Sequence, residues 1–245
     1  MFFIIANPKH MLVGAAKAFG VAIKGAKYKQ VHYLELLGAL YAVFRLAKTK
    51  GDLALETHVE KPAESPLFAN FPTLLADHHA IEFLCDYLRL VTLGAKSPHD
   101  IEAIMDRDLE LHHEEQHALV AALSVVADGA PAMGIVAAVL GVIVTMASIT
   151  EPPEILGKLI GAALVGTFSG ILVSYGVLSP VAAAVNSANI SDAAYLGCIK
   201  AAIIGHMQGY APQISIEFAR KQLGSHLRPT FAEVEAMIQN VPTAA

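Results

Sequence analysis

The sequence predicts an all-α integral membrane protein with two transmembrane helices and a helical cytoplasmic domain. Three observations lead to this prediction. The 245 residues are 55% hydrophobic and only 16% charged, with a mean hydropathy of +0.51, whereas a soluble domain has about 25% charged residues. Two charge-free stretches are long enough to cross a bilayer, and outside them apolar residues recur at the spacing of helices.

The first predicted span is Pro131–Ile149, within a region between Asp128 and Glu151 that contains no charged residue. The second is Leu159–Ser179, the beginning of a charge-free stretch of 33 residues. We expect Pro180 to break this stretch, because proline cannot donate the hydrogen bond that continues a helix. Glycine and alanine recur in both spans, which favours close packing in a helix bundle.

Basic residues set the expected orientation. Twelve of the 17 Lys and Arg residues precede Pro131, four follow Ser191, and only Lys158 lies between the spans. The positive-inside rule then places both flanks in the cytoplasm and Thr150–Lys158 outside. The expected divisions are the tail end of a preceding transmembrane helix (1–8), a cytoplasmic helical domain (9–130), a transmembrane hairpin (131–185) and a C-terminal cytoplasmic helix and tail (186–245).

The first residues, Met1–Ala6, read MFFIIA. This stretch is too short for the core of a signal peptide, and no basic residue precedes it. We expect it to be the tail end of a membrane helix, with Asn7-Pro8-Lys9 marking the exit into water.

The predicted cytoplasmic domain alternates helical segments with breaks. Lys9–Lys50 is basic and amphipathic, and the three prolines of Glu60–Pro72 predict an irregular connection. Helical periodicity returns over Leu74–Leu93. Ser97 is a plausible N-cap and Pro98 a plausible first residue of the charged helix that follows.

That charged helix contains His113–His117, a match to the zinc-protease motif H-E-x-x-H, which places two imidazoles on one helical face. A catalytic zinc needs a third protein ligand. The next ionisable residues are Asp128 and Glu151, and the second of these is expected across the bilayer. We therefore interpret the match as part of a solvated acidic helix and expect no metal, no cofactor and no enzymatic activity. A zinc metalloprotease is the less favoured alternative.

Neither span contains an acid, a base or a histidine, so this chain cannot carry protons through the membrane on its own titratable groups. A partner must supply such a group if the chain serves an ion pathway. The spans do contain hydroxyl groups, namely those of Thr145, Ser148, Thr167, Ser169 and Ser174. A hydroxyl that bonds back to a carbonyl of its own helix is the favoured interpretation for each, over a functional role.

Two prolines, Pro131 and Pro180, bracket the predicted hairpin near its cytoplasmic boundary. They can be simple helix punctuation. They can equally be hinges through which events at membrane depth move the cytoplasmic domain. The sequence favours neither interpretation over the other.

The net charge and the two cysteines argue against nucleic-acid binding and against a disulfide framework. The net charge of −5 gives no basic surface for nucleic acid, and we expect no nucleic-acid partner. The two cysteines, Cys85 and Cys198, lie far apart in apolar surroundings, so we expect buried free thiols.

Four segments carry a resemblance that covers nearly the whole chain. They read YLELLGALYAVFRLAKTKGDLALETHVEKP, LADHHAIEFLCDYLRL, the hairpin PAMGIVAAVLGVIVTMASITEPPEILGKLIGAALVGTFSGILVSYGVLSPVA, and GYAPQISIEFARKQL followed by RPTFAEVE. Together they resemble the MotA-type flagellar stator proteins of the MotA/TolQ/ExbB proton channel family. Such proteins have four membrane helices, so the resemblance implies an N-terminally truncated form that begins near the end of the second.

The resemblance implies a bacterial inner-membrane protein, with most of the chain cytoplasmic. It implies a homo-oligomeric ring around a MotB-like single-span subunit whose membrane aspartate carries the ion. Proton flow would drive torque on the rotor protein FliG. A TolQ- or ExbB-like subunit that energises envelope transport is the alternative within the family, but the long domain before Pro131 argues against it.

Carried over by position, the resemblance implies roles for particular residues. The rotor-interaction pair falls on Lys48 and Glu56, with lysine where the family often has arginine. The conformational prolines fall on Pro131 and Pro180. The candidate ion-path residues are Thr167, Ala138 and Thr145. Ala138 stands where sodium-type relatives carry threonine, which favours protons as the ion.

Overall fold

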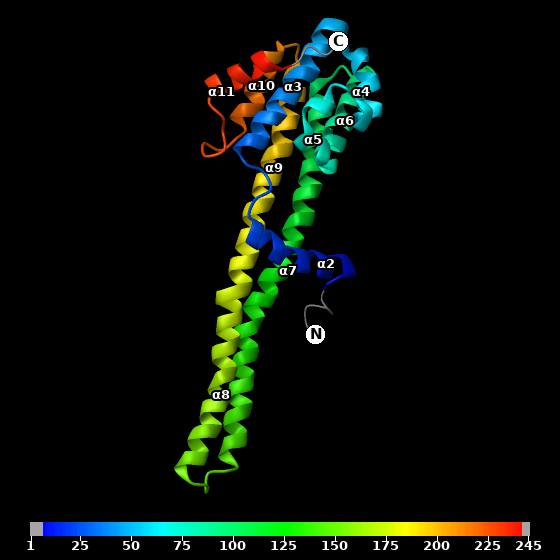
Figure 1. Cartoon of the computed structure of the whole chain (residues 1–245). Coiled ribbons are helices and arrows are strands. Elements are labelled where there is room, and N and C mark those ends of the chain that lie inside the picture. Colours follow the sequence, from blue (N-terminus) through cyan, green and yellow to red (C-terminus); the bar gives the residue numbers. More distant parts are fainter. Residues whose placement is uncertain (1–6, 242–245) are drawn as a thin grey trace. The chain divides into compact units, whose positions relative to one another are not determined.

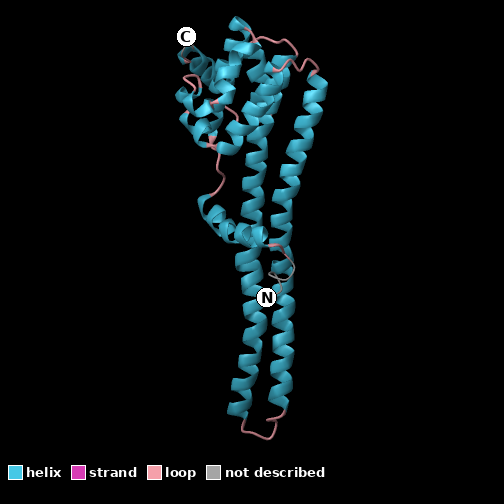
Figure 2. Ribbon diagram, turned by 90° about the vertical axis from the view of Figure 1, so that its right-hand side faces the viewer, coloured by secondary structure: helices cyan, strands magenta, loops and turns pink. Residues whose placement is uncertain are grey.

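The computed structural model describes residues 7–241, and these form helices and connecting turns without a strand (Figures 1 and 2). Met1–Ala6, the expected tail of a membrane helix, lies outside the described residues. The α-helices are α2 (Lys9–Lys24), α3 (Gln30–Lys50), α4 (Glu56–Glu60), α5 (Pro72–Ala76), α6 (His78–Thr92), α7 (Pro98–Met146), α8 (Pro153–Val173), α9 (Ser179–Met207), α10 (Pro212–Lys221) and α11 (Phe231–Asn240). Short 3-10 turns lie at Asp52–Leu55, Pro62–Glu64 and Phe68–Asn70, and a π turn lies at Ser174–Leu178.

The chain forms two compact units. One contains α2 together with Glu114–Asn189, which includes most of α7 and all of α8. The other contains Ala26–His113 and the chain from Ile190 onward. Each unit is therefore assembled from two separate parts of the sequence.

The second unit is built around α3, which is buried along most of its length. Its side chains, among them Tyr33, Leu40 and Phe44, are fully buried in one hydrophobic core with residues of α6, α7, α9 and α10. At Gly38 the packing is tight, because a methyl group there would lie 2.6 Å from Sδ of Met237 in α11 and would require this side chain to shift. Both cysteines are buried free thiols, as predicted, and burial raises the pKa of each thiol to about 12.

The first unit contains the larger part of each of the two candidate membrane helices. Pro98–Met146 and Pro153–Met207 each include an 18-residue window apolar enough to span a bilayer, and only 11% and 6% of these windows are buried. The core helix of a soluble protein would be mostly buried, so these exposed apolar faces favour membrane spans. Figures 1 and 2 both show α7 and α8 side by side as an antiparallel hairpin.

The predicted start of the charged helix is confirmed. The helix α7 begins at Pro98, and the backbone N–H of Asp100 donates to Oγ of Ser97 over 3.3 Å. The hydroxyl thus caps an N–H that has no partner inside the helix.

The expected break at Pro180 is wrong. The chain stays helical from Pro153 to Met207, passing through the π turn Ser174–Leu178 directly before the proline. A proline ring clashes with the carbonyl four residues earlier, here that of Gly176, and a wider turn relieves this clash. The N–H of Ser179 accordingly donates to the carbonyl of Ser174, five residues back.

Pro131 does not open a helix either. It lies inside α7, which runs without interruption from Pro98 to Met146. The polar link between the predicted spans is also shorter than expected, because α8 already begins at Pro153 and includes Lys158.

Candidate functional site

The two apolar helices approach each other closely next to Pro131. A methyl group on Gly134 would lie 2.7 Å from the carbonyl oxygen of Gly166, and one on Gly170 would lie 2.7 Å from that of Ala130. Only residues without a side chain let two backbones come this close. The recurring small residues of the sequence therefore predicted real contacts between the helices.

Pro131 removes one hydrogen bond from α7. It has no N–H to offer the carbonyl of Ala127, four residues earlier. Ser174 supplies the missing partner, because its Oγ donates to the Ala127 carbonyl oxygen over 2.6 Å. Ser174 is only 1% exposed, and a buried carbonyl left without a partner would be destabilising.

The predicted ion-path residue Thr167 also bonds across the hairpin. Its Oγ1 donates to the carbonyl oxygen of Gly134 over 3.4 Å. Thr145 differs, because its Oγ1 donates to the carbonyl of Gly141 in its own helix over 2.9 Å. The expectation of local bonding is thus confirmed for Thr145 and wrong for Thr167 and for Ser174.

Ala138 lies on the face of α7 that meets α8. A methyl group on Gly166 would lie 3.6 Å from the backbone nitrogen of Ala138. The structure thus brings Ala138 and Thr167 to one helix crossing. Thr145 lies two helical turns further along α7 and lines a groove of about 370 Å³ between the helices.

The predicted rotor-interaction pair lies at one end of the other unit. Lys48 is in the last turn of α3, and Glu56 is the first residue of α4. Both side chains are exposed. The chain reverses between them at Gly51, whose φ of 87° suits glycine. Nζ of Lys48 donates to the carbonyl of Gly209 over 3.4 Å.

A groove of about 500 Å³ adjoins this pair and was missed by the sequence analysis. Lys48, Asp52, Lys96 and His206 are among its lining residues. Nε2 of His206 lies 2.9 Å from Oδ1 of Asp52, although the two are far apart in the sequence. Charges of both signs therefore surround Lys48.

A second polar cluster, also missed, is centred on Asp77. This carboxylate accepts a hydrogen bond from the hydroxyl of Tyr28 and forms an ion pair with Lys27 at 2.7 Å. Burial alone raises the pKa of Asp77, but the hydrogen bonds from Lys27 and Tyr28 outweigh it and lower that pKa overall. Burial raises the pKa of Asp192, whose Oδ1 is buried without a hydrogen-bond partner.

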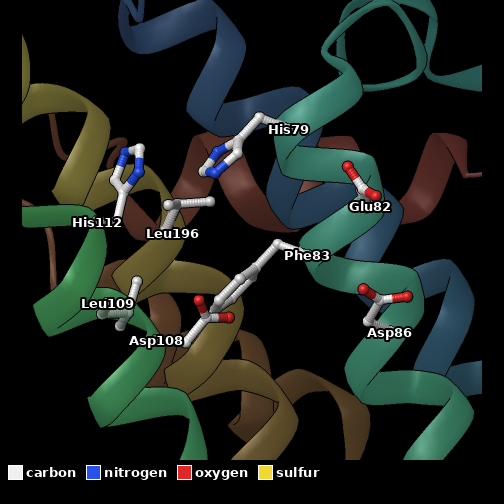
Figure 3. A pocket seen from close by; sticks show the side chains of 8 residues that line it. All are labelled: His79, Glu82, Phe83, Asp86, Asp108, Leu109, His112 and Leu196. Carbon is white, nitrogen blue, oxygen red and sulfur yellow. The ribbon is translucent and has the colours of Figure 1, made fainter. Parts of the chain in front are cut away.

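A pocket of about 190 Å³ in the same unit gathers histidines and acids from α6 and α7 (Figure 3). The rings of His79 and His112 stack with their centroids 4.5 Å apart. The hydroxyl of Tyr87 donates to Asp108, one of the lining acids, over 3.0 Å.

The H-E-x-x-H match at His113–His117 is helical, as expected, and its two histidines and Glu114 are exposed. Within residues 7–241, no three His, Cys, Asp or Glu side chains are grouped so that they could hold a metal ion. The third ligand that a catalytic zinc requires is therefore not provided by the described part of the chain.

Two family models and several known proteins match this sequence. Residues 76–194 match the model of the MotA/TolQ/ExbB proton channel family, and residues 1–51 match that of the motility protein A N-terminal region. Motility protein A of Salmonella typhimurium is 39% identical over 98% of this chain and 81% of its own length. Motility protein A of Escherichia coli is 38% identical with the same coverage.

A solved structure shares this fold. The structure of C. jejuni MotAB matches with a TM-score of 0.73 and 22% identity, over 91% of this chain and 79% of that chain. A helical hairpin with two long apolar helices and a further helical unit thus has a known counterpart in a solved structure. The chain belongs to the MotA/TolQ/ExbB proton channel family.

Proposed function

We propose that this chain is the ring-forming subunit of a bacterial flagellar stator. With a MotB-like single-span partner it forms a proton channel, and it couples proton flow to torque on the rotor protein FliG. The observation that carries the proposal is the identity of 39% with a motility protein A over 98% of the chain. An identity spread over both units supports a shared function rather than a shared hairpin alone.

The composition of the hairpin fits this function. Neither Pro131–Ile149 nor Leu159–Ser179 contains an acidic, basic or histidine residue. The titratable group that carries the proton must then come from a partner, which the MotB-like subunit would supply. Ala138 and Thr167, at the helix crossing, are the residues we propose to face that group.

We place 131–185 in the inner membrane and 9–130 with 186–245 in the cytoplasm. The excess of lysine and arginine on both flanks supports this orientation. The exposed apolar side chains of α7 and α8, such as Val139 and Phe168, leave surface for lipid, for the partner and for further copies of the chain. A ring of copies around the partner uses all three kinds of contact.

A complementation assay tests the proposal. The chain is expressed with a MotB-like partner in bacteria that lack their own stator genes, and swimming is scored in soft agar. We expect swimming that is lost with Pro131→Leu or Thr167→Ala and kept with His113→Ala. Loss of motility with His113→Ala alone would instead favour the zinc site, and absence of swimming by the unmodified, membrane-inserted pair would contradict the stator function.

The ion is tested in the same strain. Because Ala138 offers no hydroxyl to a bare sodium ion, we expect swimming speed to be independent of sodium and abolished by a protonophore. A speed that rises with sodium concentration in the presence of the protonophore would show that sodium is the ion.

A further inference from the structure

We propose that Ser174 is a positioning residue that links the two proline sites of the hairpin. Its hydroxyl replaces the hydrogen bond that Pro131 removes from α7, and it does so from the π turn that precedes Pro180. A change of helix geometry at one proline is then transmitted to the other through this bond. The proposal deepens the stator function proposed above and rests on it.

The first step of the argument concerns the carbonyl of Ala127. In an uninterrupted helix this oxygen would accept from the N–H of residue 131, but proline has none. Ala127 is only 2% exposed, so water cannot serve as the replacement. The hydroxyl of Ser174 lies 2.6 Å away and donates a hydrogen bond to this buried oxygen.

The second step concerns the direction of the serine hydroxyl. A serine inside a helix ordinarily bonds back to a carbonyl three or four residues earlier. Ser174 begins the π turn instead, and its own carbonyl accepts from Ser179, five residues on. This turn exists where Pro180 follows, because the proline ring crowds the carbonyl of Gly176. The donor of the bond therefore belongs to the Pro180 distortion and its acceptor to the Pro131 distortion.

The third step concerns the packing beside the bond. The hairpin is held close here by Gly170, where a methyl group would lie 2.7 Å from the carbonyl of Ala130. With the backbones this near, a short side chain such as serine can reach across, and a small shift between the helices would break the bond. A hydrogen bond that closes or opens with helix position suits a hinge.

A double-mutant cycle tests whether the bond compensates the proline. Ser174→Ala, Pro131→Ala and the double variant are purified with the MotB-like partner, and thermal unfolding midpoints are compared. Ser174→Ala should lower the midpoint by about 2–4 °C with Pro131 present. In the Pro131→Ala background, Ser174→Ala should lower the midpoint only a little, because the new N–H of residue 131 then donates to the Ala127 carbonyl. Equal costs in the two backgrounds would overturn the proposed pairing.

Rotation of single motors tests the positioning role. In cells without their own stators, a bead on the flagellum speeds up in steps as complexes join the motor. We expect Ser174→Ala to reduce the height of each step about twofold or more, whereas a merely structural defect would change only the number of steps. Unchanged step height would overturn the positioning role, even if the midpoints show the bond.

Ser169→Ala is the matched control, since Ser169 is an exposed residue of α8, which leads directly into the π turn of Ser174. We expect neither its midpoint nor its step height to differ from those of the unmodified chain. Absence of any steps with the unmodified chain would contradict the stator function, and the midpoint cycle would still decide on the bond.

Discussion

At the scale of single residues, the polar side chains that bond inside the two spans are hydroxyls rather than acids, bases or histidines. Thr167 and Ser174 each donate to a carbonyl of α7, and Thr145 donates within its own helix. Such bonds satisfy backbone acceptors without bringing a charge into a membrane span, where a charge is costly. Most of the charged residues lie in the other unit, where solvent and ion pairs accommodate them.

Asp77 gives a prediction for that unit. Its pKa is lowered in the folded protein, so its stabilising contribution is present above its ordinary pKa of about 3.9 and is lost as the pH falls through the lower, folded value. Asp77→Asn should therefore lower the thermal unfolding midpoint at pH 7, and the difference from the unmodified protein should shrink below about pH 4. Midpoints measured from pH 3 to pH 8 check this, and a difference that grows at acid pH would contradict it.

Asp192 should behave in the opposite way. Burial raises its pKa, so its ionised form destabilises the fold at neutral pH, and this cost disappears as the pH falls through the folded pKa. The charges that act on it are those of Lys27, Asp77 and His79. Asp192→Asn should raise the unfolding midpoint at pH 7 and have less effect at acid pH. A lower midpoint at pH 7 would show that its carboxylate is stabilising.

At the scale of elements, the hairpin depends on glycines that lie between α7 and α8. Gly134 and Gly170 leave no room for a methyl group without a shift of backbone, whereas a methyl group on Gly161 would meet nothing within 4 Å. Position along the helix therefore decides whether a glycine in this hairpin is needed.

This contrast makes a direct prediction. Gly170→Ala should destabilise the hairpin by about 1–3 kcal/mol, because its methyl group would overlap the carbonyl of Ala130. Gly161→Ala should be neutral or stabilising by about 1 kcal/mol, because alanine is the better helix former and has space. Thermal unfolding of the purified complex distinguishes the two, and equal effects would contradict the helix crossing described above.

At the scale of the whole molecule, the chain combines two apolar spans that contain no acid, base or histidine with a unit that carries an exposed pair of opposite charges, Lys48 and Glu56. We propose that the first carries the proton path with its partner and that the second contacts the rotor. In this proposal, the proton path and the rotor contact belong to different compact units of one chain.

The rotor contact can be tested by charge reversal. Lys48→Glu with Glu56→Lys should reduce the swimming speed severalfold, because both interactions with the rotor become repulsive. Lys50→Glu is the control, since Lys50 is also exposed in the last turn of α3 and lies outside the proposed pair. Normal swimming of the double reversal, or an equal loss with the control, would remove the special role of these two residues.

The sequence was informative where a feature is local. Charge-free runs predicted both apolar helices, and Ser97 with Pro98 predicted the start of α7. Pro180 misled, because the chain widens into a π turn instead of ending the helix. The bond from Ser174 to Ala127 and the contacts of Asp77 were not predicted, because each joins residues 47 to 50 positions apart whose meeting depends on helix register and tertiary packing.

The rotation of a single motor tests the central claim most directly. The chain and a MotB-like partner are induced in cells without stators, and the speed of a bead on one flagellum is followed. We predict that the speed rises in equal steps and falls to zero when a protonophore collapses the proton gradient. A bead that stays still while both proteins are present together in the membrane would contradict the claim that this chain is a proton-driven stator subunit.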